Sequence, residues 1–171
     1  RTVMHLEAEK WIELLGLEPH PEGGFFRESY RSKTVVAQTE LVEAFGGPRA
    51  MSTAIYYLLD EANFSAIHRI ESDEMWHFYA GSPLRVEGLH PNGTRQDWIL
   101  HNDPTIGRPQ EIVPARTWFG SRLVDPTGYA LVGCTVAPGF DFSDFEMADP
   151  KVLMGDYPEH SSWIQSLTRN A

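Results

Sequence analysis

The chain has 171 residues, of which 42% are hydrophobic, and it includes 9 Phe, 6 Tyr and 5 Trp. This content is enough to bury one packed core, so we predict a single domain over residues 1–171. The formal net charge of −10 argues against nucleic acid and anionic membranes as partners, because both repel an acidic surface.

Cys134 is the only cysteine, which excludes an intramolecular disulfide and a cysteine-rich zinc site. We expect neither a signal peptide nor a membrane-spanning segment, because no stretch of the sequence has the required apolar length and flanks. A chain with a single cysteine and no intramolecular disulfide fits a reducing compartment. The expectation is therefore a cytoplasmic protein.

The first segment is predicted to be a short amphipathic helix over residues 6–15. Its apolar positions recur at helical spacing, and Gly16 follows where a left-handed cap would end the helix. These apolar positions are Ala8, Trp11, Ile12 and Leu15.

Beyond this helix the pattern changes to short strands separated by turns. The strand candidates are "FFRESYRS", "STAIYYLL", "FSAIHRI", "EMWHFYAG", "EIVPARTWFGSRLV" and "YALVGCTVAP". "LRVEGLHPNGTRQDWIL" is predicted to be a hairpin that turns at Asn92 and Gly93. With no helices between the strands, the pattern favours an all-β sandwich or barrel. "VVAQTELVEAFGGPRA" is expected to be a loop, and the tail "PEHSSWIQSLTRN" a short helix.

Alternation along two neighbouring strands divides the segment "HRIESDEMWHFYAG" into two faces. His68 and Glu74 each fall on a face that is otherwise apolar, while His77 and Arg69 point the other way. Burying a polar group among apolar neighbours costs free energy of folding unless the group is hydrogen-bonded or has a function in a site. Two interpretations stay open: a buried His–Glu hydrogen bond that holds the sheet together, or a pocket in which a carboxylate raises the pKa of a histidine.

The spacing of this segment resembles the first cupin motif, with His68, Ile70, Glu74 and Gly81 at its positions. The wider order of "HPEGGFFRESYRS", "SAIHRIESDEMWHFYAGSPLRV", "VPARTWFGS" and "YALVGCTVAPGFDFSDFE" is similar to the Cupin-5 family of small single-domain cupins. The resemblance implies a double-stranded β-helix, that is, a jelly-roll barrel, to which the predicted short helices at both ends would be added. It also implies a homodimer with one pocket in each subunit.

The same resemblance argues against a metal cofactor. A metal-binding cupin would offer three histidines and one glutamate, but Ile70 and Phe119 stand at two of the histidine positions. Zinc and iron sites usually need at least three protein ligands. We therefore expect no metal ligands and no cofactor.

The expected pocket would hold a small, carbohydrate-like molecule, because aromatic walls stack on sugar rings and a His–Tyr pair can move a proton next to a carbonyl. The resemblance extends to metal-free sugar-nucleotide epimerases, which use a histidine base and a tyrosine acid. The leading hypothesis is a metal-independent isomerase or epimerase of a sugar or sugar nucleotide. A non-catalytic ligand-binding module and a metal-dependent cupin enzyme are the alternatives.

The candidate residues follow from these hypotheses. The catalytic candidates are His68, Glu74 and Tyr30, the last placed by alternation on the same face as Glu28. The ligand-binding candidates are Arg27, Glu28, Ser65, Arg69, Trp76, His77, Phe78, Trp118 and Phe119. For the charged residues the alternative is an exposed face, and for His77 a structural role. Phe140, Phe142 and Phe145 are expected in the core or at an interface.

Overall fold

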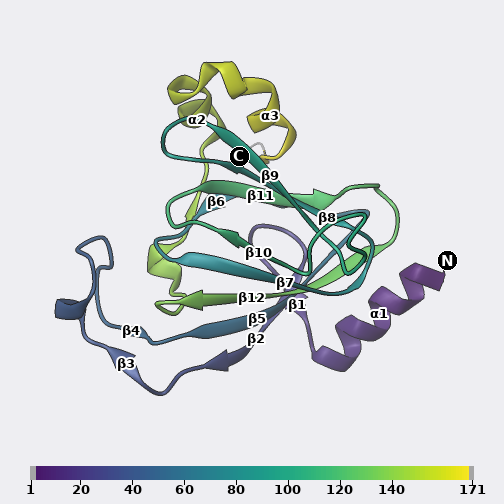
Figure 1. Ribbon diagram of the computed structural model, residues 1–171, viewed down its shortest axis with the longest axis horizontal. Coiled ribbons are helices and arrows are strands. Elements are labelled where there is room, and N and C mark those ends of the chain that lie inside the picture. Colours follow the sequence, from purple (N-terminus) through teal and green to yellow (C-terminus); the bar gives the residue numbers. More distant parts are fainter. Residues whose placement is uncertain (1–2, 170–171) are drawn as a thin grey trace.

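The computed structural model describes residues 3–169 and contains two facing antiparallel sheets (Figure 1). The first has six strands in the order β1 (Glu18–Pro19), β2 (Phe25–Arg31), β5 (Thr53–Asp60), β12 (Tyr129–Ala137), β7 (Asp73–Gly81) and β10 (Gln110–Val113). The second has five, in the order β13 (Glu146–Met147), β6 (Ser65–Arg69), β11 (Trp118–Leu123), β8 (Leu84–Leu89) and β9 (Arg95–Leu100). The predicted all-β jelly roll is confirmed.

The core lies between these two sheets and is built from alternate residues of their strands. Trp76 and Phe78 of β7 are buried there, together with Val86 of β8 and Phe119 of β11. Strands β8 and β9 form the predicted hairpin, and Gly93 in its turn has a φ of 86°, which suits glycine. The expected alternation of β7 holds for Trp76 and Phe78 but not for Ala80, because Tyr79 is an extra residue opposite β12 and Ala80 packs with the cluster around Ala8 instead.

Helices lie at both ends of the chain, as predicted. Helix α1 (Val3–Leu15) begins three residues before the predicted start at Leu6 and packs Ala8 against Leu58 and Leu131, on the outer side of the six-stranded sheet. Figure 1 shows it on one side of the barrel, away from the C-terminal helices.

The C-terminal region holds two short helices, α2 (Pro150–Asp156) and α3 (Ser161–Ser166), with the 3-10 turn η3 (Pro158–His160) between them. The predicted tail helix corresponds to η3 and α3. Its last residue, Asn170, lies outside the described residues, as do the other terminal residues of the predicted domain, 1–2 and 171. Helix α2 was not predicted, although Asp149 caps it and Pro150 opens it, which is a recognisable start signal.

The expected loop after β2 contains a two-stranded sheet, β3 (Val35–Val36) and β4 (Arg49–Ala50), with the 3-10 turn η1 (Gln38–Glu40) between the strands. A buried ion pair holds β4 in place, because Arg49 Nη2 lies 2.7 Å from Asp144 Oδ1. Asp144 belongs to the 3-10 turn η2 (Phe142–Asp144), so this excursion is attached to the segment before β13.

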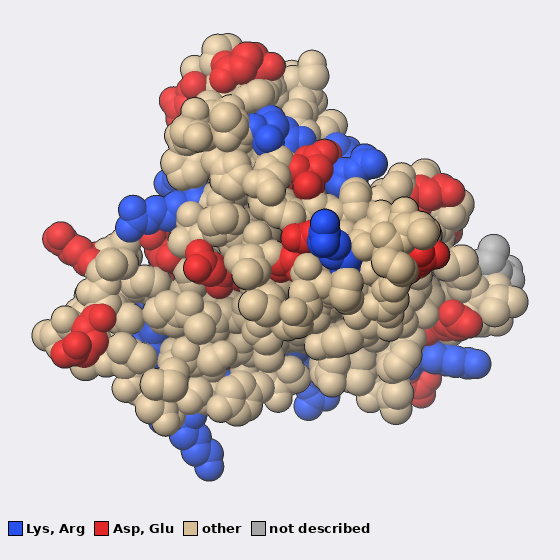
Figure 2. Space-filling view, viewed as in Figure 1, with Lys and Arg blue, Asp and Glu red and all other residues tan. Residues whose placement is uncertain are grey.

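The surface mixes charges of both signs. On the face shown in Figure 2, Lys and Arg side chains are interspersed with Asp and Glu rather than gathered in one stripe. Within residues 3–169 no helix is both long and apolar enough to cross a membrane.

Candidate functional site

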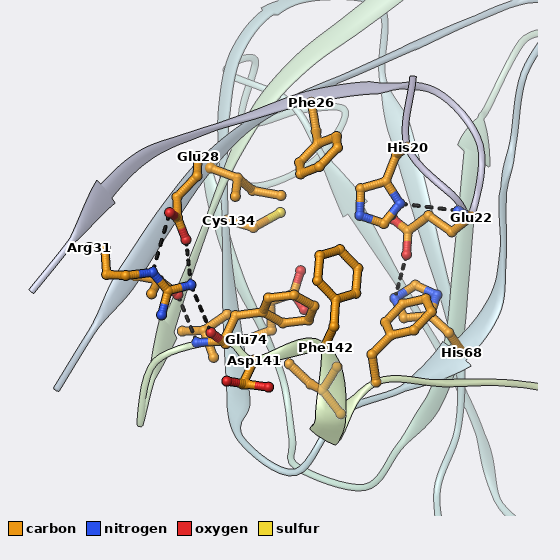
Figure 3. A pocket seen from close by; sticks show the side chains of 16 residues that line it. His20, Glu22, Phe26, Glu28, Arg31, His68, Glu74, Cys134, Asp141 and Phe142 are labelled. Atoms are coloured by element: carbon orange, nitrogen blue, oxygen red, sulfur yellow. Dashed lines mark hydrogen bonds and ion pairs between the residues drawn. The ribbon is translucent and has the colours of Figure 1, made fainter. Parts of the chain in front are cut away.

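A pocket of about 400 Å³ opens at one end of the barrel and reaches the space between the sheets (Figure 3). Five parts of the chain line it: the turn before β2 with β2 itself, the start of β5, the β6–β7 region, β12, and the segment after β12. The lining residues are His20, Glu22, Phe26, Glu28, Arg31, Thr53, Ile55, His68, Ile70, Glu74, Cys134, Val136, Phe140, Asp141, Phe142 and Phe145.

His68 lies on β6 in the wall of the pocket, and both of its ring nitrogens are bound to the protein. Nδ1 donates to the carbonyl oxygen of Ala66 at 2.7 Å, and Nε2 lies 2.9 Å from Glu22 Oε2. Burial opposes the charged ring, but the charge and hydrogen bond of Glu22 outweigh it and raise the pKa of His68. Burial likewise opposes the charged form of Glu22, and His68 overcomes it, so the pKa of Glu22 is lowered. The two groups form an ion pair.

His20 faces the same pocket from the turn before β2. Its Nδ1 accepts a hydrogen bond from the backbone N–H of Glu22 at 3.1 Å, and burial lowers its pKa. A ring that is neutral and accepts at Nδ1 carries its proton on Nε2. His20 therefore offers an Nε2–H donor to a ligand. Sequence reasoning missed both His20 and Glu22, because they lie in a glycine turn rather than on a strand.

The backbone of that turn explains how Glu22 reaches His68. Gly23 and Gly24 have φ values of 112° and 75°, which a residue with a side chain rarely adopts. The carbonyl oxygen of Glu22 accepts from the N–H of Ala66 on β6 at 2.9 Å. The two glycines thus let the turn close onto β6, so that the Glu22 carboxylate meets the His68 ring.

Glu74 is also buried, at 9% exposed, but it is not the direct partner of His68. Within residues 3–169 it makes no ion pair, and the thiol of Cys134 is its hydrogen-bond neighbour. Burial raises the pKa of Glu74 to about 7, against the opposing charge of His68. His68 and Glu74 both point inward, as expected, but His68 pairs with Glu22 rather than with Glu74.

A β-bulge in β2 decides which of its charged residues enter the pocket. Glu28 pairs with Ile55 and Tyr30 with Ala54, so Ser29 is extra and the alternation is shifted after it. Arg31 consequently lines the pocket with Glu28, and its Nη2 lies 2.6 Å from Glu28 Oε1. Tyr30 is 56% exposed and does not line the pocket.

Aromatic rings form much of the remaining wall. Phe140, Phe142 and Phe145 were expected in the core or at an interface, but all three line the pocket, together with Phe26. Their ring centroids lie 4.9 Å apart for Phe140 and Phe142 and 6.0 Å apart for Phe142 and Phe145. They come from the segment around η2, which the Arg49–Asp144 ion pair anchors.

Of the twelve candidate residues, the structure places His68, Glu74 and Glu28 in the pocket lining. Four others are buried in the barrel without lining it: Ser65, Trp76, Phe78 and Phe119. Phe119 supports the site from behind, because its ring centroid lies 4.3 Å from that of His68.

The other candidates, apart from Tyr30, lie away from the pocket. Arg69 lies over the Trp118 ring at 4.3 Å and pairs with Glu146. His77 bonds to Thr135 Oγ1, and Arg27 reaches the carbonyl oxygen of Leu15. These contacts stabilise neighbouring elements.

The residues of this pocket do not fit the metal set that cupins commonly hold. Ile70 lines the pocket where a second histidine would be needed, and Phe119 is buried where the last one would be. Among residues 3–169, no group of three or more His, Cys, Asp or Glu side chains has an arrangement that could hold a metal ion.

Two solved structures resemble this chain over nearly its whole length. The crystal structure of a Shewanella oneidensis protein is 39% identical with a TM-score of 0.85, and covers 96% of this chain and 98% of its own. A hypothetical protein from Leishmania major is 34% identical with a TM-score of 0.84, and the match covers 95% of this chain and 99% of that protein. No curated protein matches the chain.

A more distant likeness concerns the fold alone. Oxalate decarboxylase from Bacillus subtilis is 13% identical with a TM-score of 0.53, over 87% of this chain and 36% of the enzyme. The family model for Cupin-5, described as "Cupin superfamily (DUF985)", matches residues 9–148. On this match and on the two full-length relatives, the chain belongs to the Cupin-5 family of the cupin superfamily.

Proposed function

We propose that the protein is a metal-independent isomerase or epimerase that moves a proton on a small carbohydrate-like ligand. The observation that carries the proposal is Glu74, a buried carboxyl group that faces the pocket, makes no ion pair within residues 3–169, and has a pKa of about 7. A group whose pKa lies near the working pH is the most effective proton acceptor and donor.

In this proposal Glu74 removes a proton from a carbon next to a carbonyl group of the ligand. The electron pair of that C–H bond moves to the carbonyl oxygen and gives an enediolate, to which the Nε2–H of His20 donates a hydrogen bond. The proton of the adjacent hydroxyl group passes to the former carbonyl oxygen beside the His20 imidazole. Glu74 then returns its proton to the former carbonyl carbon, and the carbonyl group has moved by one carbon. Inverting a single carbon would need a second donor on the opposite face, so isomerisation is the simpler reaction for this pocket.

His68 has a positioning role in this scheme, because both ring nitrogens are already bound. Its ion pair with Glu22 fixes the turn that carries His20, whose Nδ1 accepts from the Glu22 N–H. Tyr30, more than half exposed, takes no part.

Hydrogen exchange with solvent tests this proposal. The protein is incubated in D₂O with a panel of aldoses, ketoses and nucleotide-linked sugars, and deuterium at carbon is followed by NMR. We expect incorporation into at least one of them, with a rate that falls about 100-fold or more in Glu74→Gln. Tyr30→Phe is the matched control and should leave the rate unchanged. Equal rates in Glu74→Gln and the wild type would refute the role of Glu74.

A non-catalytic ligand-binding module is the second candidate. It is favoured by the fully engaged His68 and by the aromatic wall, both of which would serve binding alone. Saturable binding of a panel member with no exchange into any of them would support this candidate over the enzyme.

A further inference from the structure

We infer that the ligand of this pocket is a cation, and that its ammonium group sits among the phenylalanine rings within reach of the Glu74 carboxylate. The inference rests on the proposed function and deepens it, because it names the chemical class of the ligand. It follows from the charges of the lining residues and from the placement of the rings.

The lining residues carry more negative than positive groups. Glu22 is neutralised by His68, and Glu28 by Arg31, which holds it through two nitrogen–oxygen contacts of 2.6 and 3.3 Å. Glu74 remains, and no cationic side chain pairs with it within residues 3–169.

Asp141 is a second lining carboxylate that makes no ion pair in the described part of the chain. Its Oδ1 accepts from the N–H and the hydroxyl of Ser143, and these bonds, with smaller contributions from the charges of Arg49 and Arg31, lower the pKa of Asp141. It therefore keeps its negative charge. Glu74 and Asp141 would repel a phosphorylated or carboxylate ligand, whereas they would attract a cation.

The rings provide the second part of the site. Phe140, Phe142 and Phe145 lie with centroids 4.9 to 6.3 Å apart, and Phe26 and His20 continue the wall at a centroid distance of 4.4 Å. Figure 3 shows Phe26 and Phe142 projecting toward the interior of the pocket. The faces of aromatic rings attract a cation within about 6 Å of the centroid, and more strongly where water is excluded.

A cationic ligand also suits the proposed chemistry. An ammonium group on the carbon beside the reacting C–H bond, as in a 3-amino aldose, withdraws electrons and makes that bond more acidic, while the carbonyl and hydroxyl carbons stay available for the proton transfer. In the pocket that group would lie among the rings while Glu74 takes the proton. The compact volume of about 400 Å³ suits a molecule of this size.

The charge state of Glu74 makes the inference dependent on pH in a defined direction. Above a pH of about 7 the carboxyl is ionised, so affinity for a cation should rise between pH 6 and pH 8. The titratable and charged groups around it are Cys134 on β12, His68 on β6, Glu22 and His20 on the preceding turn, and Glu28, Arg31 and Asp141 at the pocket wall.

A pair of probes that differ only in charge tests the inference. Choline and 3,3-dimethylbutan-1-ol have the same shape, but only choline is a cation. By isothermal titration calorimetry at pH 8 we expect choline to bind about tenfold or more tightly than the alcohol. The preference should fall by about tenfold at pH 6. Equal affinities, or tighter binding of the alcohol, would overturn the inference.

Two variants separate the contributions of charge and ring. Glu74→Gln should abolish the pH dependence of choline binding, and Phe142→Leu should weaken choline binding about threefold or more without changing the affinity of the alcohol. Phe142 is 54% exposed, so its replacement leaves the fold intact. Choline binding that is unaffected by both variants would place the cation elsewhere and refute the site.

The outcomes of this experiment and of the exchange assay can be told apart. A preference for choline without deuterium exchange would refute the proposed isomerase activity and support the cationic ligand. Deuterium exchange into neutral sugars with no preference for choline would support the proposed isomerase activity and refute the cationic ligand.

Discussion

Replacing Glu74 with glutamine should make the protein more stable in alkaline solution. Glu74 is 9% exposed and has no cationic partner within residues 3–169, so ionising it inside the barrel costs free energy. Glutamine has nearly the same shape and never ionises. The variant therefore removes the unfavourable charge and leaves the packing of the pocket in place.

The magnitude follows from the pKa of Glu74, which burial raises from its ordinary value of 4.5 to about 7 in the folded protein. Between these values the folded state holds a proton that the unfolded state has released, so the stability of the wild type falls as the pH rises. The stabilisation is fully present below pH 4.5 and is lost above pH 7. At 1.36 kcal/mol per pH unit, the loss between pH 5 and pH 8 is about 2.5 kcal/mol.

Urea denaturation of both proteins at pH 5 and pH 8 measures this effect. The free energy of unfolding of Glu74→Gln, relative to the wild type, should rise by about 2.5 kcal/mol between the two pH values. In thermal melts the same change corresponds to about 5–10 °C. Glu61→Gln in an exposed turn is the control for a general carboxylate effect. A difference between Glu74→Gln and the wild type that is the same at both pH values would refute the reasoning.

Three further predictions concern the turn before β2 and the assembly. Glu22→Gln removes the anionic partner of buried His68, so the pKa of His68 should fall below 6.5 in an NMR titration. The lost charge-assisted hydrogen bond should cost about 1 kcal/mol or more of stability at pH 7; an unchanged titration would contradict the ion pair. Gly23→Ala should destabilise the protein by about 1 kcal/mol or more, because its φ is 112° and a Cβ would collide with the Phe64 carbonyl oxygen. The control for this variant is Gly155→Ala in helix α2, which has open space around it and should be neutral or stabilising. We also propose the homodimer expected from the sequence, for which light scattering should give twice the 19.4 kDa mass of the chain, and a mass of 19.4 kDa would contradict it.

Most of the strands could be predicted from the sequence, and so could the inward position of His68 and Glu74, because alternation in a regular strand fixes which side chains share a face. That rule put His68, Glu74 and Trp76 inside the barrel and His77 outside, and the structure agrees. The family could be recognised as well, since its motifs follow one another in a fixed order along the chain.

Alternation fails wherever the strand is irregular, and the rest of the site lies at such places. One extra residue, Ser29, exchanges the expected places of Tyr30 and Arg31 relative to the pocket.

Residues that reach the site from outside the regular strands could not be placed by spacing at all. Glu22 and Phe142 approach from a glycine turn and a 3-10 turn, and their positions depend on contacts with strands far along the chain. The sequence by itself thus determined the barrel and the inward face that carries His68 and Glu74. The tertiary structure alone decided that Glu22 would pair with His68 and leave Glu74 as the unpaired acid, because pairing of buried charges depends on which groups folding brings within a few ångströms.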